Sequence, residues 1–399
     1  MSIFAGLAPL PPDAILGLSE EYSRDTRPGK VSLAAGVFVD ETGITPVLAT
    51  VAEAEARILA AQTTKLYKPV AGDPAYLRPV RGLVFGSGNA AVAEGRVETL
   101  HTPGGTGALR VAADLVHRLR PGATIWMSTP TWPNHPQVFA AAGMATASYP
   151  YLDPATGTLD AAGMLAALRG APAGDVVLLH ACCHNPTGID PTPDVWRQVG
   201  DVIAERGLLP LVDFAYQGFG DGLEVDAAGL QSLIRPGAEL LVASSFSKNF
   251  SLYDERVGAL SIVGASRDEA VTLLSHAKAT VRANYSNPPA HGGEVVATIL
   301  ADEALRARWV DEVSAMRARI KGNRRLFVDG LREAGAPDFS RLLDQRGMFS
   351  LLGLSADQVR RLKEEHAVYV VGGGRVNVAG ITQRNLEPAC RAIAAVIAG

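Results

Sequence analysis

Lys248 is the residue of this sequence whose type and position best suit covalent chemistry. It follows the apolar run ELLVASS (239–245) within SSFSKNFSLYDER, and Arg256 comes eight residues later. Only seven of the 37 basic residues are lysines, so a lysine in this setting stands out. A partly desolvated lysine close to other cations has a lowered pKa and can attack a carbonyl to form a Schiff base. The alternative is an ordinary lysine of a surface loop.

A glycine cluster precedes a helical pattern in HTPGGTGALRVAADL (101–115). Gly105, Thr106 and Gly107 can let several backbone N–H groups converge at the start of that helix, where they would bind a phosphate. A tight structural turn has the same composition. The spacing matches neither a Walker A loop nor a full dinucleotide fingerprint.

A carboxylate and a phenol come at the end of the apolar run LLPLVD (208–213). Asp213 closes the run and Tyr216 follows three residues later. A carboxylate in this position binds a metal, caps a helix or pairs with a cationic nitrogen. No set of His or Cys at ligand spacing accompanies Asp213, which disfavours a metal. A protonated pyridine nitrogen and a helix cap both remain possible partners.

Two further segments bring side chains to the ends of expected strands. ACCHNPTGIDPT (181–192) places Asn185 before a proline, and STPTWPNH (128–135) carries Trp132 and His135. An X-Pro bond at a strand end adopts the cis form in some proteins and then aims the preceding side chain, although trans is the default. For Trp132 and His135 ordinary packing is the alternative interpretation.

Taken together, these residues match the separate chemical handles of pyridoxal phosphate. The cofactor has a phosphate, an aldehyde, a ring nitrogen, a phenolic oxygen and an aromatic face, and each needs its own protein group. The sequence offers a glycine cluster, a lysine, a carboxylate, a phenol and an indole, with an arginine for the dianion. We therefore expect a pyridoxal phosphate site and no metal.

The elements that must position these residues are apolar runs separated by helical patterns between about residues 97 and 265. Strands are expected at 123–128, 146–151, 175–182, 208–214, 239–245 and 257–263, and helices at 108–120 and 193–207. Continuous apolar runs suit strands that are covered on both faces, so the pattern predicts a mostly parallel sheet flanked by helices. Such sheets bind ligands at the carboxyl ends of their strands.

The rest of the chain predicts a second, smaller unit. After about residue 266 come long helices with heptad-like apolar spacing, broken near Pro288 and Pro289, and then a short mixture of strands and helices. We expect a large cofactor-binding domain at 46–315 and a small α+β domain formed by both chain ends, 1–45 with 316–399.

Composition excludes several classes of protein. The 399 residues carry 37 Lys and Arg against 41 Asp and Glu, so the formal net charge is −4 and no basic surface for nucleic acid or a membrane is expected. Hydrophobic residues make up 47% and charged residues 20%, which is typical of a globular protein. The adjacent Cys182 and Cys183 suit a reducing compartment, and the N-terminus does not resemble a signal peptide, so we expect a cytoplasmic protein.

Longer motifs through nearly the whole chain resemble the aspartate and aromatic amino acid aminotransferases, which are pyridoxal phosphate enzymes of fold type I. Beside the segments above they include GVFVDETGITPVL (36–48), DFAYQGFGDGLEVDA (213–227), VRANYSNPPAHG (281–292), RGMFS (346–350) and GRVNVAG (374–380). The resemblance implies an α/β fold with a mostly parallel central sheet plus a smaller α+β domain. It also implies transfer of an amino group between an L-amino acid and 2-oxoglutarate by a ping-pong mechanism.

The resemblance implies roles for the cofactor-binding residues. Lys248 would form the Schiff base and later move the proton at the substrate's Cα, and Asp213 would keep the ring nitrogen protonated. Tyr216 and Asn185 would bind the phenolic oxygen, and Trp132 would stack on the ring. The other residues implied in cofactor binding are His135, which would support Asp213 from behind, and a group around the phosphate: Gly105, Thr106, Ser245, Arg256 and Tyr67 of the partner subunit.

The resemblance also implies how substrate is bound. Arg375 would grip the α-carboxylate through a bidentate pair, with Gly36, Trp132 and Asn185 nearby. Arg282 of the partner subunit would pair with the distal carboxylate of aspartate or glutamate. Two subunits would then complete each site, so the resemblance implies a homodimer.

Three departures from the pattern of aspartate-preferring relatives concern specificity. Val39 and Leu66 stand where those relatives typically have a lysine and an asparagine, and Ala34 replaces a glycine. A more apolar pocket entrance would admit aromatic side chains beside the dicarboxylates. The alternatives are a strictly aspartate-specific enzyme and a different fold type I enzyme, such as a β-lyase. An NAD-dependent oxidoreductase is disfavoured, because it would leave Lys248 without a role.

Overall fold

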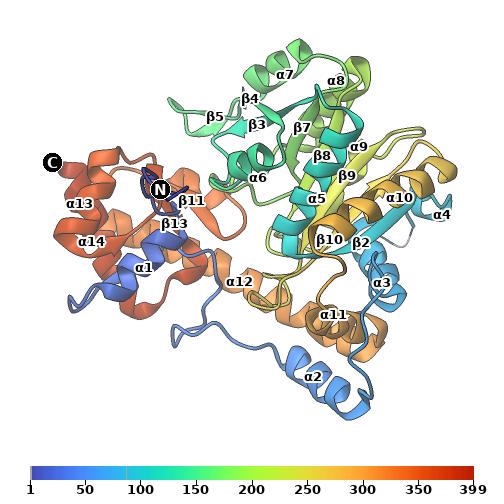
Figure 1. Ribbon diagram of the computed structural model, residues 1–399. Helices are drawn as coiled ribbons and strands as arrows, with labels where there is room; N and C mark the ends of the chain where they lie inside the picture. The colour runs from blue at the N-terminus through green and yellow to red at the C-terminus, as the bar shows by residue number, and fades with distance from the viewer. Residues whose placement is uncertain (1, 87) are drawn as a thin grey trace.

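The computed structural model describes residues 2–86 and 88–399, and its centre is a seven-stranded sheet (Figure 1). The strand order is β2-β10-β9-β8-β7-β3-β4. The strands are β2 (Val97–Pro103), β3 (Thr124–Thr129), β4 (Ala145–Pro150), β7 (Val176–His180), β8 (Leu209–Phe214), β9 (Leu240–Ser245) and β10 (Val257–Val263). The side chains of β7, β9 and β10 are buried on both faces of the sheet. This explains why their sequences read as continuous apolar runs.

Most neighbouring strands are parallel, and β10 is the exception. Pairs β3–β4, β3–β7, β7–β8 and β8–β9 are parallel, whereas β10 is antiparallel to both β9 and β2. Only residues 246–256 join β9 to β10. A parallel return needs a crossover of a dozen or more residues, usually a helix, so this short connection brings the chain back antiparallel.

Helices cover both faces of the sheet and form two cores. On one face, α5 (Gly104–Leu119), α6 (His135–Ala141) and α10 (Arg267–Asn284) pack over a core that includes Leu211 and Leu241. On the other face lie α7 (Ala161–Gly170), α8 (Pro193–Arg206) and α9 (Ala228–Leu233), over a core that includes Val212 and Val242. The alternation of neighbouring strand residues between the two cores follows from the two-residue period of a strand. The predicted sheet flanked by helices is thus confirmed.

A smaller group of elements lies at one side of the sheet (Figure 1). It contains two two-stranded sheets, one of β1 (Val31–Ser32) with β12 (Val368–Tyr369) and one of β11 (Phe349–Leu351) with β13 (Arg375–Asn377), and the helices α1 (Leu16–Arg24), α13 (Ala356–His366) and α14 (Gln383–Ala398). Both chain ends therefore contribute to it. The 31-residue helix α12 (Glu303–Glu333) runs through the predicted boundary at residue 315, so the division into domains stays a prediction.

The remaining elements are short or peripheral. They are α2 (Ala49–Ala61), α3 (Pro74–Phe85), α4 (Ala90–Ala93), α11 (His291–Ala301) and the small hairpin of β5 (Leu152–Asp153) with β6 (Thr158–Leu159). Helices α10 and α11 are separated by the segment with Pro288 and Pro289, as the sequence predicts. In the part of the chain that the structure describes, no helix is both long and apolar enough to span a membrane.

Candidate active site

A cavity of about 400 Å³ opens at the edge of the sheet where most strands end. Strands β2, β3, β7, β8 and β9 all run towards this edge, and the antiparallel β10 starts from it. The segments after five strands and before a sixth therefore meet here, as expected for ligand sites of α/β sheets. The residues predicted from the sequence that line the cavity are Gly36, Gly105, Thr106, Trp132, Asn185, Asp213, Tyr216, Ser245, Lys248, Arg256 and Arg375.

Lys248 is the amine of this cavity. It lies three residues after β9, with its Nζ 4.9 Å from the centre of the Tyr216 ring. Burial lowers the pKa of Lys248 from 10.5 to about 8; the nearby Asp213 opposes this shift, and Arg256 and Arg375 add to it. A lysine in this range is partly unprotonated near neutral pH, as a nucleophile or a base requires.

Asp213 is held from behind by a histidine. The Nε2 of His135 lies 3.0 Å from Oδ2 of Asp213, and the other ring nitrogen, Nδ1, lies 2.8 Å from the hydroxyl of Thr131. Burial alone would raise the pKa of Asp213, but the hydrogen bond and charge of His135, with smaller contributions from His180 and Lys248, bring it below its ordinary value. Asp213 therefore remains a carboxylate that can pair with a protonated ring nitrogen.

Tyr216 and Asn185 lie together across the cavity. The side-chain amide of Asn185 donates to the hydroxyl of Tyr216 over 3.3 Å, and the peptide bond between Asn185 and Pro186 is cis. Burial raises the pKa of Tyr216, so its hydroxyl keeps its proton and can donate a hydrogen bond. Trp132 lines the same cavity, with its ring 5.1 Å from that of His135 in an edge-on arrangement.

One end of the cavity is built to hold a dianion. Gly105 and Thr106 lie in the first turn of α5, where backbone N–H groups are free of intrahelical partners. A Cβ added to Gly105 would come within 3.0 Å of Cβ of Ser245, so glycine permits the close approach of the two strand ends. Arg256 donates to the hydroxyl of Ser247 over 3.2 Å, and among the described residues it pairs with no carboxylate.

A second anion-binding group lies opposite. Arg375 is only 1% exposed, yet within the described chain it has no carboxylate partner. Its guanidinium donates to the carbonyl oxygen of Ala34 at 2.6 Å and to Oδ1 of Asn185 at 3.2 Å, and stacks 4.3 Å from the centre of the Phe349 ring. The buried Nε has no acceptor. Burying a cation with an unused donor is costly unless an anion completes the site.

These donors fit pyridoxal phosphate together with an amino acid. The helix start with Arg256 suits the phosphate, and Lys248 suits the aldehyde. Asp213 suits the ring nitrogen, and Arg375 remains free for a carboxylate. The residues that the sequence predicts for the separate groups of the cofactor therefore lie around one cavity.

Three predicted site residues lie outside the cavity of this chain. His135 is fully buried behind Asp213. Tyr67 is 91% exposed, and Arg282 is exposed near the end of α10, where it donates to the hydroxyl of Ser286. Neither of the last two reaches the cavity of its own chain, so their predicted roles are not tested by a single chain.

Several lining residues were not predicted. Asp13, Ile15 and Leu16 border the cavity from the N-terminal segment, where Oδ1 of Asp13 accepts the N–H groups of Ile15 and Leu16. No motif marks this segment. The packing of Phe349 against Arg375 also had no signal before the resemblance, because the two residues lie 26 positions apart on β11 and β13. Ser247 could have been found from the serine-rich run before Lys248.

Comparisons with known proteins agree with this geometry. Residues 28–393 match the family model of class I and II aminotransferases. The aspartate aminotransferase of Escherichia coli is 51% identical over 396 residues, covering 99% of this chain and 100% of that protein. The aromatic-amino-acid aminotransferase of Pseudomonas aeruginosa is 48% identical over 399 residues, covering 100% of both.

Among solved structures, the aromatic-amino-acid aminotransferase of Burkholderia pseudomallei, covalently bound to pyridoxal phosphate, has a TM-score of 0.95 and 47% identity, covering 99% of this chain and 100% of that chain. The fold is therefore that of the fold type I pyridoxal phosphate enzymes. With a family model matching most of its length and relatives near 50% identity from end to end, the chain belongs to the class I and II aminotransferase family.

Proposed function

We propose that the protein is a pyridoxal phosphate-dependent aminotransferase that moves the amino group of aspartate and aromatic L-amino acids to 2-oxoglutarate. The observation that carries the proposal is the lysine with a lowered pKa between two unpaired arginines in one cavity. Arg256 serves the cofactor and Arg375 serves the substrate. A β-lyase would share the cofactor residues and would also bind an α-carboxylate, but it would have no need of Arg282 for a distal carboxylate.

The residues of the chain divide the chemistry among them. Pyridoxal phosphate, when bound, supplies an aldehyde for the amino group and a ring that withdraws electrons from the substrate's Cα. Lys248 would hold the cofactor at its aldehyde and, once its amine is free, would accept the proton from the substrate's Cα as a base. Asp213 keeps a proton on the ring nitrogen, and His135 keeps Asp213 ionised and oriented.

The other residues position the reactants. Arg375, which has no carboxylate partner in the described chain, would bind the α-carboxylate of the substrate. This binding would aim the substrate's Cα–H bond at Lys248. Tyr216 and Asn185, which are hydrogen-bonded to each other, would donate to the phenolic oxygen, and Trp132 would cover the ring. Gly105, Thr106, Ser245 and Arg256, which line the same cavity, would hold the phosphate.

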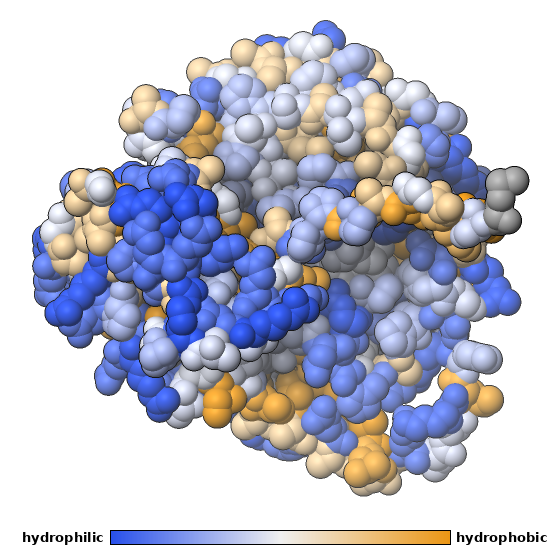
Figure 2. All heavy atoms as spheres, turned by 60° about the vertical axis from the view of Figure 1, so that its left-hand side comes forward, coloured by the Kyte–Doolittle hydropathy of each residue, from blue (hydrophilic) through white to orange (hydrophobic). Residues whose placement is uncertain are grey.

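We also propose a homodimer in which Tyr67 and Arg282 complete the partner's site. Several large apolar side chains are exposed, one of them next to Tyr67 in the sequence, which supports a surface buried by a second copy. Leu66 is 78% exposed beside Tyr67, and Leu10 in the N-terminal segment is 90% exposed. Figure 2 shows that hydrophobic residues are exposed on one face of the molecule. The buried free cysteines support placement in the cytoplasm.

Replacing Lys248 tests the mechanism. Lys248→Ala removes both the amine that holds the cofactor and the base, so we expect transamination to fall at least about ten-thousandfold. Borohydride treatment of the wild-type holoenzyme should attach the cofactor to the peptide that contains Lys248. Lys278→Ala, on α10 outside the cavity, is the matched control. Full transamination by Lys248→Ala would refute the proposal.

The range of amino donors needs a separate measurement. Half-buried Val39 and exposed Leu66 support an apolar entrance, whereas Arg282 favours a dicarboxylate. A site with a buried arginine disfavours a neutral side chain unless that arginine moves aside. We expect kcat/KM for phenylalanine within about a thousandfold of that for aspartate, which is about 4 kcal/mol, with 2-oxoglutarate as acceptor. A larger gap would indicate a strictly aspartate-specific enzyme.

A further inference from the structure

A second cavity, of about 440 Å³, lies at the opposite edge of the central sheet from the active site. It is bordered by the amino ends of β8 and β9 and by the end of β10. The six-residue strands β8 and β9 put about 20 Å between the two edges. A ligand at this edge would therefore not touch the groups that bind cofactor and substrate.

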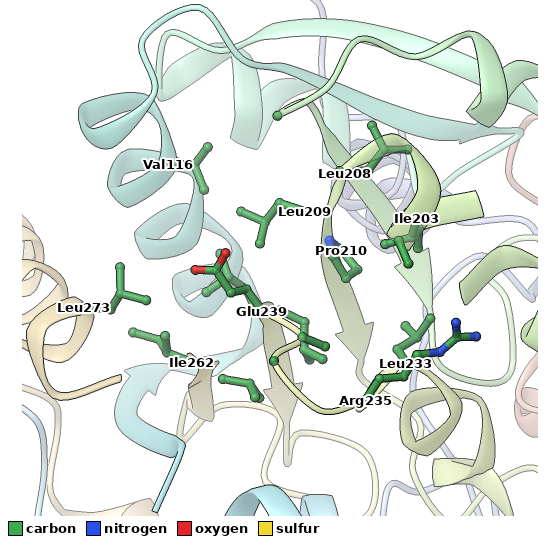
Figure 3. A pocket seen from close by; sticks show the side chains of 18 of the residues that line it. Val116, Ile203, Leu208, Leu209, Pro210, Leu233, Arg235, Glu239, Ile262 and Leu273 are labelled. Atoms are coloured by element: carbon green, nitrogen blue, oxygen red, sulfur yellow. The ribbon is translucent and has the colours of Figure 1, made fainter. Parts of the chain in front are cut away.

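The walls of this cavity are mainly aliphatic. Val116 of α5 and Leu273 of α10 come from one face of the sheet, and Ile203 of α8 comes from the other. Leu209 and Ile262 lie at the strand ends between them (Figure 3). The volume falls within the range of small-molecule sites, which are typically apolar with a few polar groups.

One carboxylate faces this apolar space. In Figure 3 the carboxylate of Glu239 lies among Val116, Leu209, Ile262 and Leu273. Glu239 lines the cavity but is exposed to solvent, and among the residues that the structure describes it has neither a hydrogen-bond donor nor an ion-pair partner. An unpaired carboxylate against aliphatic walls gains most from a cation that carries its own apolar surface.

The two arginines at the cavity are not placed to pair with Glu239. Arg235 points away from it, and its guanidinium pairs with Asp201 at 2.9 Å (Figure 3). The guanidinium of Arg120 lies against Gly174, before β7, which is two strands from the start of β9. Two strand spacings correspond to about 10 Å.

We propose that this cavity, named here the amino-edge pocket, binds a small apolar molecule that carries an ammonium group, of the size of an arylalkylamine. The aromatic or alkyl body fills the space between α5, α8 and α10, and the ammonium pairs with Glu239. The proposal is independent of the proposed aminotransferase activity.

A tertiary amine distinguishes the amino-edge pocket from the active site. N,N-dimethyl-2-(4-fluorophenyl)ethylamine cannot condense with an aldehyde and has no carboxylate for Arg375. Titrated into the holoenzyme and followed by fluorine NMR, it should bind one site per chain with a Kd of about 0.1 to 1 mM. The neutral alcohol 3-(4-fluorophenyl)propan-1-ol should bind about tenfold more weakly or not at all.

Variants assign the site. Glu239→Gln should raise the Kd about tenfold, whereas Glu205→Gln, an exposed residue of α8 outside the cavity, should leave it unchanged. Ala204→Leu, on the exposed side of α8, should fill the pocket and abolish binding while transamination stays at the wild-type rate. Arg120→Gln should not weaken binding.

Each contrary outcome would overturn the proposal. These are a Kd that does not change in Glu239→Gln, unchanged binding by Ala204→Leu, loss of binding in Arg120→Gln, and absence of binding to the wild-type protein, as when a second copy covers the cavity. Near-ultraviolet circular dichroism of each variant checks that the fold is retained.

Discussion

At the scale of single residues, Arg375 is the residue whose loss should lower kcat/KM for every substrate. In the described structure no carboxylate of the chain pairs with its buried guanidinium, and its Nε has no hydrogen-bond acceptor. Burial lowers the pKa of Arg375 to about 10, which still leaves it charged at neutral pH. The site therefore keeps a permanent positive charge ready for the one group that all amino and oxo acids share, the carboxylate next to the reacting carbon.

Arg375→Lys tests this interpretation. Lysine keeps the charge but not the planar fork that binds a carboxylate through two hydrogen bonds. We expect kcat/KM to fall about a thousandfold, or about 4 kcal/mol, for aspartate and phenylalanine alike. Arg391→Lys, on an exposed ion pair of α14, is the control and should leave kcat/KM unchanged. A fall confined to one of the two amino acids would contradict the shared role.

The pKa of Lys248 predicts a pH effect on stability in the cofactor-free protein. The folded pKa, about 8, lies below the ordinary 10.5 because of burial. Between these values the unfolded chain binds more protons than the folded one, so the free energy of unfolding rises with pH. Below pH 8 the buried charge costs about 3 kcal/mol, and this cost disappears as the pH approaches 10.5.

Lys248→Met isolates that contribution. The variant has no charge to bury, so we expect it to be more stable than the wild type by up to about 3 kcal/mol at pH 7, with the difference shrinking towards pH 10. Urea unfolding of both cofactor-free proteins across this pH range measures it. A difference that stays constant with pH would show that packing, and not the amine, is responsible.

At the scale of elements, α12 connects the sheet to the smaller group of strands and helices. Its buried face includes Trp309, Val313, Met316 and Ile320, at spacings of three and four residues. This is the period of one helix face, and it explains the heptad-like spacing in the sequence. The helix is thus fixed along its length by packing on one side only.

Ile320→Ala should weaken this packing. Ile320 is fully buried, so its truncation leaves a cavity and should lower the free energy of unfolding by about 2 to 4 kcal/mol. Arg325→Ala, on the exposed side of the same helix, should change it by less than about 0.5 kcal/mol. Both values can be measured by urea denaturation of the holoenzyme. Equal effects of the two variants would contradict the packing argument.

The elements also show how far the sequence predicts the structure. All six predicted strands exist within one or two residues of their predicted ends. Buried strands such as β7, β9 and β10 leave apolar runs, whereas β4 is a mostly exposed edge strand. Strand β2 was not predicted, since VETLHTP is mostly polar and is neither a continuous apolar run nor an alternation of polar and apolar residues. The antiparallel direction of β10 was also not assigned, although the short segment before it contained the signal.

The sequence predicts those site residues that lie at the end of an apolar run or shortly after it. Lys248, Asp213 and Asn185 follow apolar runs and so had to meet at one edge of a parallel sheet. The N-terminal residues such as Asp13 could not be placed in this way, because their position depends on contacts between distant parts of the chain. The cation–aromatic contact of Arg375 with Phe349 is of the same kind.

At the scale of the whole molecule, the proposed sharing of sites between two subunits predicts that two inactive variants can restore each other. Lys248→Ala disables its own site, and Arg282→Ala should disable dicarboxylate binding in the partner's site. A mixed dimer has one site with both residues intact and one with neither. Because an equal mixture contains about half mixed dimers, refolding the two together should restore about a quarter of the wild-type activity towards aspartate.

The controls follow from the same symmetry. Each variant refolded alone should stay inactive towards aspartate, and the mixture should be a dimer by light scattering. No activity in the mixture, despite mixed dimers, would place Arg282 outside the site. A monomer would contradict the proposed assembly itself.

The short connection between β9 and β10, residues 246–256, carries both Lys248 and Arg256. Each end of this loop is anchored in the sheet, so the spacing between the amine of Lys248 and Arg256, the arginine proposed for the phosphate, is set by two strands and not by helices. The groups around the substrate, by contrast, come from the N-terminal segment, from β11 and β13 and, as proposed, from a second chain. The loop that carries Lys248 and Arg256 thus lies apart from most of the groups proposed for substrate choice, and Asn185, which contacts both Tyr216 and Arg375, joins the two sets. Mutations in the N-terminal segment can therefore change substrate choice while the loop keeps its geometry.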